Sequence, residues 1–237
     1  MPTTERDKRS NELAANLASV RRRVAAACAA AGRDADDVTL IAVTKTFPAS
    51  DIRLLAELGV ADIGENRDQE AAPKAAACAD LTVTWHFVGQ LQTNKARSVA
   101  TYADIVHSVD RPRLVAALSA AATRAGRTLR CLVQVALDGD PERGGARPAD
   151  VPEIAARIAA AAGLEPAGVM AVAPLGADPA PAFAALAGVA AALRAEHPGA
   201  TIISAGMSAD LEQAITHGAT HVRVGTALLG GRRAIVR

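Results

Sequence analysis

The sequence predicts a single (β/α)8 barrel, and three observations lead to that prediction. Apolar, β-branched runs alternate with alanine-rich helical stretches from residue 38 to the C-terminus. The runs are apolar throughout and do not alternate with polar residues, as is typical of parallel strands buried on both faces. Eight such units in about 200 residues favour a closed barrel over an open sheet.

The predicted elements follow one another in strict order. The strands are predicted at 38–46, 61–66, 85–90, 104–110, 129–137, 166–174, 201–207 and 220–228. The helices between them are predicted at 50–59, 67–79, 92–102, 111–125, 149–162, 179–196 and 209–217. Before the first strand, apolar residues recur at three- and four-residue spacing within residues 1–33, which predicts an amphipathic helix that packs on the barrel.

Nothing in the chain has the composition of an interdomain linker, so we expect residues 1–237 to form one domain. The alternative, an open doubly wound sheet, commonly carries the fingerprint GxGxxG after a strand, and that pattern is missing here. One stretch rich in glycine, proline and charge, residues 138–150, follows the fifth predicted strand. In a barrel it forms a loop on the C-terminal face, where active sites lie.

Composition limits the expected partners and location. The chain has 26 basic and 25 acidic residues and a net charge of +1, so no overall field attracts nucleic acid or an anionic membrane. Aromatic residues make up 2% of the chain, which argues against base-stacking platforms. The N-terminus lacks a signal-like apolar region, and no apolar run reaches the roughly 18 residues of a membrane span. We therefore expect a cytoplasmic protein.

Cysteine and histidine spacings do not indicate a metal site or a disulfide framework. Cys28, Cys78 and Cys131 are far apart, and we expect them to be isolated, buried thiols. The five histidines show no HxxxH or HxH pattern with carboxylates, so we predict no bound metal.

Lys45 is the first candidate functional residue. It follows the apolar run of the first predicted strand, which places its amine where the strand opens into the barrel mouth. A partly desolvated lysine is a suitable nucleophile for Schiff-base formation. The alternative is a lysine that merely extends its ammonium group into solvent at a strand end.

The ends of the seventh and eighth predicted strands suggest a phosphate site. Gly206 and Ser208 precede a helix for which Ser208 is a natural N-cap, and Gly225 and Thr226 follow the next strand. In barrels, the loops after these two strands frequently bind phosphate. The alternative is a serine that only caps its helix.

Arg223 lies inside an apolar VRVG strand and therefore requires an acceptor. The acceptor could be a carboxylate from a neighbouring strand, such as Glu65, or a group on a ligand. Further polar residues near two other strand ends are Asn66, His86, Gln90 and Asn94. His86 is equally compatible with a hydrogen-bonded core histidine.

Long segments spread over nearly the whole chain resemble the YggS/PROSC family of pyridoxal 5'-phosphate (PLP)-binding proteins, the PLP homeostasis proteins. The segments are AVTKTFP (42–48), GENRDQE (64–70), WHFVGQLQTNK (85–95), HSVD (107–110), GVMAVAP (168–174) and SAGMSADLEQAITHGATHVRVGTALLG (204–230). The resemblance implies a barrel similar to the N-terminal domain of alanine racemase. It also implies a Schiff base between Lys45 and PLP, a phosphate site at Ser208, Gly225 and Thr226, a ring nitrogen facing Arg223, and Asn66 beside the cofactor.

The chain departs from the family pattern at several positions. Ala205 replaces the first methionine of SMGMS, and Leu229 stands where phenylalanine is usual. Phe47 occupies the position of a second lysine found two residues after the Schiff-base lysine in many members. In the loop after the fifth strand, Arg143 is the nearest counterpart of another lysine.

The resemblance implies a protein that binds and stores PLP, in preference to an enzyme that uses it for catalysis. Because arginine stays protonated, a PLP ring nitrogen facing Arg223 remains unprotonated. The ring then withdraws electrons only weakly from a bound amino acid. Related racemases add a tyrosine from a second domain, whereas the single tyrosine here, Tyr102, falls in a predicted helix. We expect a monomeric carrier or buffer in vitamin B6 and amino-acid homeostasis, with PLP-dependent apoenzymes as candidate recipients. The alternatives are a slow PLP-dependent amino-acid racemase and a phosphosugar Schiff-base lyase.

Overall fold

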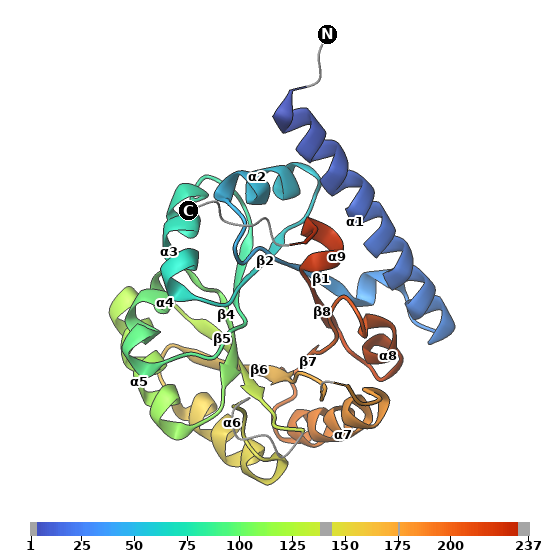
Figure 1. The fold of residues 1–237 in the computed structure, drawn as a ribbon. Coiled ribbons are helices and arrows are strands. Elements are labelled where there is room, and N and C mark those ends of the chain that lie inside the picture. Colours follow the sequence, from blue (N-terminus) through green and yellow to red (C-terminus); the bar gives the residue numbers. More distant parts are fainter. Residues whose placement is uncertain (1–3, 138–143, 175, 232–237) are drawn as a thin grey trace.

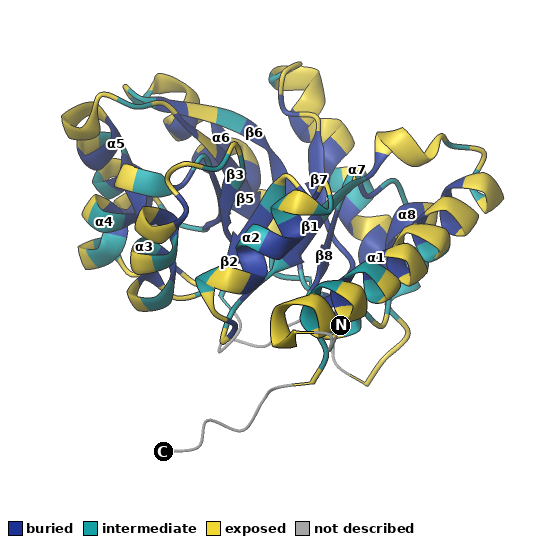
Figure 2. Ribbon diagram, turned by 90° about the horizontal axis from the view of Figure 1, so that it is seen from above, coloured by how far each residue is buried: buried dark blue, intermediate teal, exposed yellow. Residues whose placement is uncertain are grey.

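A computed structural model describes residues 4–137, 144–174 and 176–231, and it confirms the predicted (β/α)8 barrel. Eight parallel strands close into a barrel in chain order, with β1 paired to both β2 and β8 (Figure 1). The helices lie outside the barrel with their buried faces toward it (Figure 2). In the described ranges, no helix is both long enough and apolar enough to cross a bilayer.

Each strand except the last is followed by a helix that returns the chain to the opposite end of the barrel. The strands are β1 (Thr39–Val43), β2 (Asp62–Glu65), β3 (Thr84–Phe87), β4 (Ile105–Val109), β5 (Leu129–Gln134), β6 (Leu164–Met170), β7 (Ile202–Ser204) and β8 (His221–Val224). The α-helices are α1 (Glu5–Ala30), α2 (Ala49–Glu57), α3 (Asp68–Ala77), α4 (Ala96–Tyr102), α5 (Pro112–Ala125), α6 (Val151–Ala160), α7 (Ala180–Glu196), α8 (Leu211–Thr216) and α9 (Thr226–Leu229). Short 3-10 helices are η1 (Ala35–Asp37), η2 (Thr93–Lys95) and η3 (Pro148–Asp150).

The observed strands end earlier than the sequence predicts. β1 ends at Val43 because the chain turns sharply at Thr46, whose φ of 69° lies outside the β region. β8 ends at Val224, and the residues predicted to continue it form α9 instead. The polar residues that end these hydrophobic runs therefore belong to the loops at the barrel mouth and not to the sheet.

The N-terminal helix α1 lies along α8 and α9 (Figure 1). It begins with a capping box in which Thr4 and Asp7 satisfy each other's backbone N–H groups. Leu13 and Leu17 lie on its buried face, as the spacing predicts. The Asn16 side chain donates to the carbonyl of Leu228 at 3.0 Å, so α1 holds the end of α9 directly.

The barrel contains an apolar shell and a partly polar interior. Outward-facing strand residues such as Phe87 and Val106 pack beneath the helices in the largest apolar cluster. Buried polar side chains include Glu65, which faces α3, and four that meet in the barrel interior: His86, His107, Ser204 and Arg223. Because a buried polar group is costly without a partner, the contacts of these five side chains indicate how the barrel supports its site.

Candidate functional site

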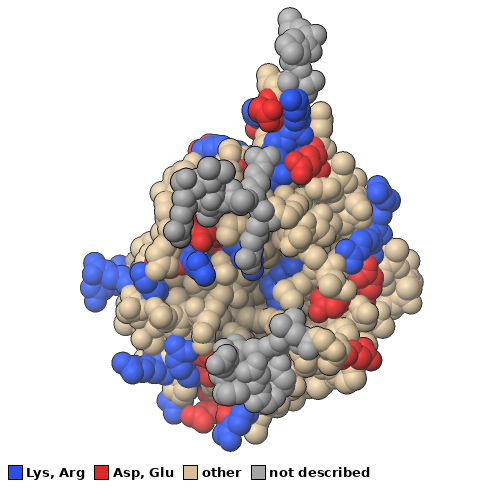
Figure 3. All heavy atoms as spheres, in the orientation of Figure 1, with Lys and Arg blue, Asp and Glu red and all other residues tan. Residues whose placement is uncertain are grey.

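Six of the residues singled out by the sequence, those expected to hold PLP, lie around one pocket at the C-terminal ends of the strands. The pocket has a volume of about 410 Å³, and its lining includes Lys45, Asn66, Ser208, Arg223, Gly225 and Thr226. Lys45 and Arg223 are the only ionisable residues among the described residues that line it. Figure 3 shows the hollow near the centre of this face, with lysine and arginine atoms at its wall.

The residues on both sides of Lys45 are anchored by acidic side chains. The hydroxyl of Thr44 donates to Oε1 of Glu65 at 2.6 Å. The N–H of Thr46 donates to Oε2 of Glu70 at 2.8 Å. A positive φ is unfavourable for a β-branched residue, so the bond to Glu70 helps to hold Thr46 in its turn. These contacts fix the base of the Lys45 side chain at the pocket.

Glu65 is buried and connects Thr44 to Lys74. Its Oε1 also accepts a hydrogen bond from Nζ of Lys74 at 2.7 Å, and the same ammonium group donates to the carbonyl of Thr44 at 2.9 Å. Burial raises the pKa of Glu65, while the hydrogen bonds from Lys74 and Thr44 act in the opposite direction. Glu65 as the partner of Arg223 is therefore wrong: its carboxylate points to Lys74, across the β2–α3 connection.

Arg223 is buried at the bottom of the pocket and has neutral partners. Its guanidinium donates to Oγ of Ser204 at 2.7 Å and to the carbonyl of Ala171 at 2.8 Å. Burial lowers the pKa of Arg223 to about 10, and the charge of Asp210 partly opposes that shift. At neutral pH the side chain remains a cation that presents only donors to the pocket.

The segments after β7 and β8 meet at Ser208. Its hydroxyl accepts from the N–H of Ala227 at 3.3 Å, which joins the two loops. The prediction that Ser208 caps the next helix is wrong: α8 begins at Leu211, and its N-cap is Asp210. The side chain of Asp210 instead accepts from the N–H of Met207 at 2.6 Å and closes the turn that carries Ser208. Ser208 is thereby directed to the pocket and α9.

Asn66 belongs to a close contact between the loops after β2 and β3. Its Oδ1 is buried and has no hydrogen-bond partner among the described residues. A Cβ at Gly89 would lie 2.1 Å from the carbonyl oxygen of Asn66, so only glycine fits there. The sequence analysis missed Gly89, which fell inside the predicted strand 85–90; a glycine within an apolar strand, a mark of close backbone approach, was the available signal.

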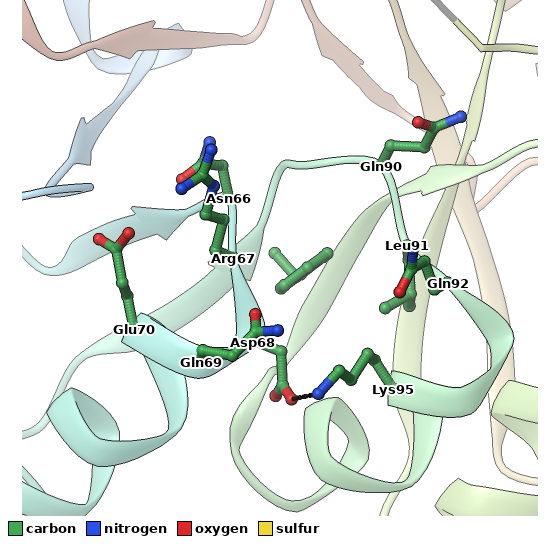
Figure 4. Close-up of a pocket in the computed structure, with 10 residues that line it drawn as sticks. Asn66, Arg67, Asp68, Gln69, Glu70, Gln90, Leu91, Gln92 and Lys95 are labelled. Atoms are coloured by element: carbon green, nitrogen blue, oxygen red, sulfur yellow. Dashed lines mark ion pairs between the residues drawn. The ribbon is translucent and has the colours of Figure 1, made fainter.

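A second pocket of about 490 Å³ adjoins the first and shares Asn66 (Figure 4). Gln90 lines this second pocket, whereas Asn94 lines neither. Its lysine, Lys95, lies 3.8 Å from a carboxylate oxygen of Asp68. In contrast to Lys45, the Lys95 ammonium therefore already has an anionic neighbour.

His86 and Tyr102 lie away from the Lys45 pocket. His86 is buried in the barrel interior, within hydrogen-bond distance of His107 and Asp62. The hydroxyl of Tyr102 donates to Asp68 at 3.4 Å, and burial raises its pKa. Tyr102 is thus not positioned as an acid or base for chemistry at Lys45.

The positions that depart from the family pattern have structural explanations in part. Phe47 is buried and lies under the guanidinium of Arg9, 5.5 Å from the ring centroid. The carbonyl of Leu229 accepts from the same guanidinium at 3.0 Å, so both positions contact α1. Ala205 is buried. Arg143 lies outside the described residues.

The barrel fold, with Lys45 in the loop after β1, agrees with the family that the comparisons identify. The sequence model of the family described as "Alanine racemase, N-terminal domain" matches residues 10–233, and the chain belongs to that family. Within it, the chain belongs to the pyridoxal phosphate homeostasis proteins. It is 47% identical to the "Pyridoxal phosphate homeostasis protein" of Mycobacterium tuberculosis, over 95% of both chains. The Escherichia coli protein of the same name is 36% identical over 94% of this chain and 97% of its own length.

Solved structures agree with this placement. PipY of Synechococcus elongatus, in a structure with PLP bound, superposes with a TM-score of 0.81 and is 37% identical, covering 92% of this chain and 100% of its own. Alanine racemase of Corynebacterium glutamicum has a TM-score of 0.67 at 16% identity, covering 92% of this chain and 60% of its own. The latter comparison supports the barrel fold alone.

Proposed function

We propose that the chain binds PLP through a Schiff base at Lys45 and serves as an intracellular carrier or buffer of the cofactor. One observation carries this proposal: the six residues expected to hold PLP line a single pocket, with Lys45 and Arg223 as its ionisable residues. The PLP-bound structure of PipY, a close relative in fold and sequence, supports the choice of cofactor.

The side chains present match the functional groups of PLP. The hydroxyls of Ser208 and Thr226 are donors suited to a phosphate. Arg223 is a buried donor for the ring nitrogen, and the unpartnered Oδ1 of Asn66 is an acceptor at the pocket wall. The amine of Lys45, in the loop after β1, completes the set.

The covalent step is reversible and needs no further reagent. The neutral amine of Lys45 attacks the aldehyde carbon, a C=N bond forms, and the aldehyde oxygen leaves as water. PLP supplies an electron-withdrawing ring when bound. Arg223 limits that property because it donates a hydrogen bond to the ring nitrogen and keeps its own proton.

The pocket favours binding and storage of the cofactor over amino-acid racemisation. Racemisation requires a proton donor and an acceptor on opposite faces of the reacting carbon. Among the described lining residues only Lys45 and Arg223 are ionisable, and an arginine keeps its proton. Tyr102, at the end of α4 and bonded to Asp68, lies away from the pocket and does not supply the second group. We accordingly assign weak or no catalysis, with a slow racemase-like activity as the alternative.

The test uses Lys45→Ala and a matched lysine variant, Lys95→Ala, in the adjoining pocket. After incubation with PLP and reduction with borohydride, mass spectrometry locates the pyridoxyl group. We expect the label on the Lys45 peptide in the unaltered protein and in Lys95→Ala, and none in Lys45→Ala. An undiminished label in Lys45→Ala would reject the site.

Carrier function and oligomeric state have separate tests. We propose a monomer that releases PLP to PLP-dependent apoenzymes. Light scattering measures the mass in solution, and a mass of two chains would contradict the monomer. Activation of a PLP-dependent apoenzyme is then timed with PLP-loaded protein and with free PLP. A carrier activates the apoenzyme even when a scavenger removes free PLP, and loss of activation with the scavenger would contradict direct transfer.

A further inference from the structure

A continuous chain of polar side chains crosses the barrel interior and ends on Arg223. Oδ1 of Asp62 lies 2.9 Å from Nε2 of His86, whose Nδ1 lies 2.9 Å from Nε2 of His107. Nδ1 of His107 lies 3.0 Å from Oγ of Ser204, which accepts from Arg223 at 2.7 Å. Consecutive hydrogen bonds thus connect β2, β3, β4, β7 and β8.

The chain spans the barrel from one end to the other. Asp62 is the first residue of β2 and lines a pocket of about 450 Å³ between the strand starts and α1. Its side chain is 25% exposed, whereas that of His86 has no exposed surface. His107 and Ser204 are also fully buried, and Arg223 lines the Lys45 pocket. The acidic end is therefore open to solvent and the basic end to the cofactor site.

Donor and acceptor capacities give the chain one direction. Arg223 can only donate, and an ionised Asp62 can only accept. His86 must then present an N–H at Nε2 toward Asp62, which leaves its Nδ1 free to accept when the ring is neutral. His107 in turn donates from Nε2 and accepts at Nδ1 from the hydroxyl of Ser204. Every contact is satisfied with both rings neutral and protonated at Nε2.

The reverse direction leaves a conflict. If His107 donated from Nδ1 to Ser204, its Nε2 would accept from Nδ1 of His86. A neutral His86 would then place an unprotonated Nε2 against the carboxylate of Asp62, and the two lone pairs would repel. Only an additional proton, on His86 or on Asp62, removes that repulsion. Burial lowers the pKa of His107 far below its usual value, which agrees with a neutral ring there.

We infer that Asp62, His86, His107 and Ser204 are positioning residues for the cofactor site: they form a one-directional hydrogen-bond chain that holds and polarises Arg223. The inference rests on the proposed role of Arg223 toward the PLP ring nitrogen. Because the Ser204 hydroxyl donates a hydrogen bond to His107, its oxygen is a stronger acceptor for Arg223. The guanidinium is thereby held by an acceptor without a full negative charge, which preserves its donor capacity toward the pocket.

The first test reads the tautomers in ligand-free protein. Long-range ¹⁵N–¹H correlation spectra of histidine-labelled protein at pH 7.5 distinguish protonated from unprotonated ring nitrogens. Single histidine substitutions assign the signals. We expect protonated Nε2 and unprotonated Nδ1 in both His86 and His107. A proton at Nδ1 of either ring would overturn the inference.

The second test removes one link and uses a serine outside the chain as the control. Ser204→Ala takes away the acceptor of Arg223, whereas Ser108→Ala removes a fully buried hydroxyl with no partner among the described residues. We expect Ser204→Ala to weaken PLP binding about tenfold, the loss of one charge-assisted hydrogen bond, and to shift the absorbance spectrum of bound PLP. Ser108→Ala should leave both unchanged. Equal affinity and an unshifted spectrum in Ser204→Ala would overturn the inference.

Two further measurements separate possible failures. Ser204→Thr keeps the hydroxyl and should restore the spectrum if the hydrogen bond is what matters. If Ser204→Ala does not fold, the tautomer measurement decides alone. Absence of the borohydride label at Lys45 in unaltered protein would reject the proposed function, whereas the tautomers of the ligand-free protein would still test the chain of hydrogen bonds.

Discussion

Nζ of Lys74 lies 2.7 Å from Oε1 of Glu65, and together they hold the residue that precedes Lys45. The carboxylate accepts from the hydroxyl of Thr44, and the ammonium donates to the Thr44 carbonyl. The pair therefore links the last turn of α3 and the end of β2 to the position of the Schiff-base lysine proposed here.

Lys74→Met should destabilise the fold strongly because it leaves the Glu65 carboxylate buried without a cationic partner. Breaking a buried pair in this way costs about 3 kcal/mol or more. The free energy of unfolding from urea titration at pH 7 measures the loss. In the double variant Lys74→Met/Glu65→Gln, a neutral amide replaces the carboxylate, so we expect much of the loss to be recovered. A double variant as unstable as Lys74→Met alone would contradict this account.

Glu70→Ala should weaken PLP binding because it releases the N–H of Thr46. Thr46 has a φ of 69°, and without its 2.8 Å bond to Glu70 the turn after Lys45 is less well held. We expect a dissociation constant raised about fivefold, the value of one modest hydrogen bond. Glu70→Gln retains an acceptor oxygen and serves as the control. Fluorescence titration with PLP measures both variants, and equal affinities for the two would refute the argument.

The barrel and the pocket residues were predictable from sequence for different reasons. Apolar runs at regular spacing predict strand order, and the family resemblance brings the residues after β1, β2, β7 and β8 to one face. The strand ends were not predictable, because the turn at Thr46 is held by Glu70 and the end of α9 is held by α1. The alternation that places His86 and His107 inside the barrel does not reveal that their ring nitrogens meet. That contact depends on the register between β3 and β4.

Acidification should destabilise the protein between pH 7 and 5, in part through His221. Burial lowers the pKa of His221 from 6.5 to about 4, so below pH 6.5 the unfolded chain binds a proton that the folded chain does not. The stability is thus complete above pH 6.5 and falls as the pH decreases toward 4. By linkage, this histidine accounts for a loss of about 2 kcal/mol at pH 5.

The contribution of His221 is isolated with His221→Asn. Urea titrations at pH 7 and pH 5 give the difference in unfolding free energy for each protein. The variant should lose about 2 kcal/mol less than the unaltered protein over this interval. His217→Asn, at a half-buried position before β8, is the matched control. The same pH dependence in His221→Asn and in the unaltered protein would contradict the prediction.

Gly206→Ala should disrupt the turn that presents Ser208. Gly206 has a φ of +85°, and a Cβ there would lie 2.6 Å from Cβ of Ala214, whereas the carbonyl of Gly206 accepts from the N–H of Arg223 at 2.9 Å. The added methyl group must therefore displace α8 or the turn, with a cost of about 1–3 kcal/mol beyond the backbone strain. Gly218→Ala has a similar φ of +91° but its nearest neighbour is 4.0 Å away, so it reports the backbone strain alone. Urea titration should show Gly206→Ala to be the less stable variant by that margin, and PLP titration should show weaker binding only in Gly206→Ala. If both variants lost the same stability, crowding against Ala214 would not explain why glycine is needed at this position.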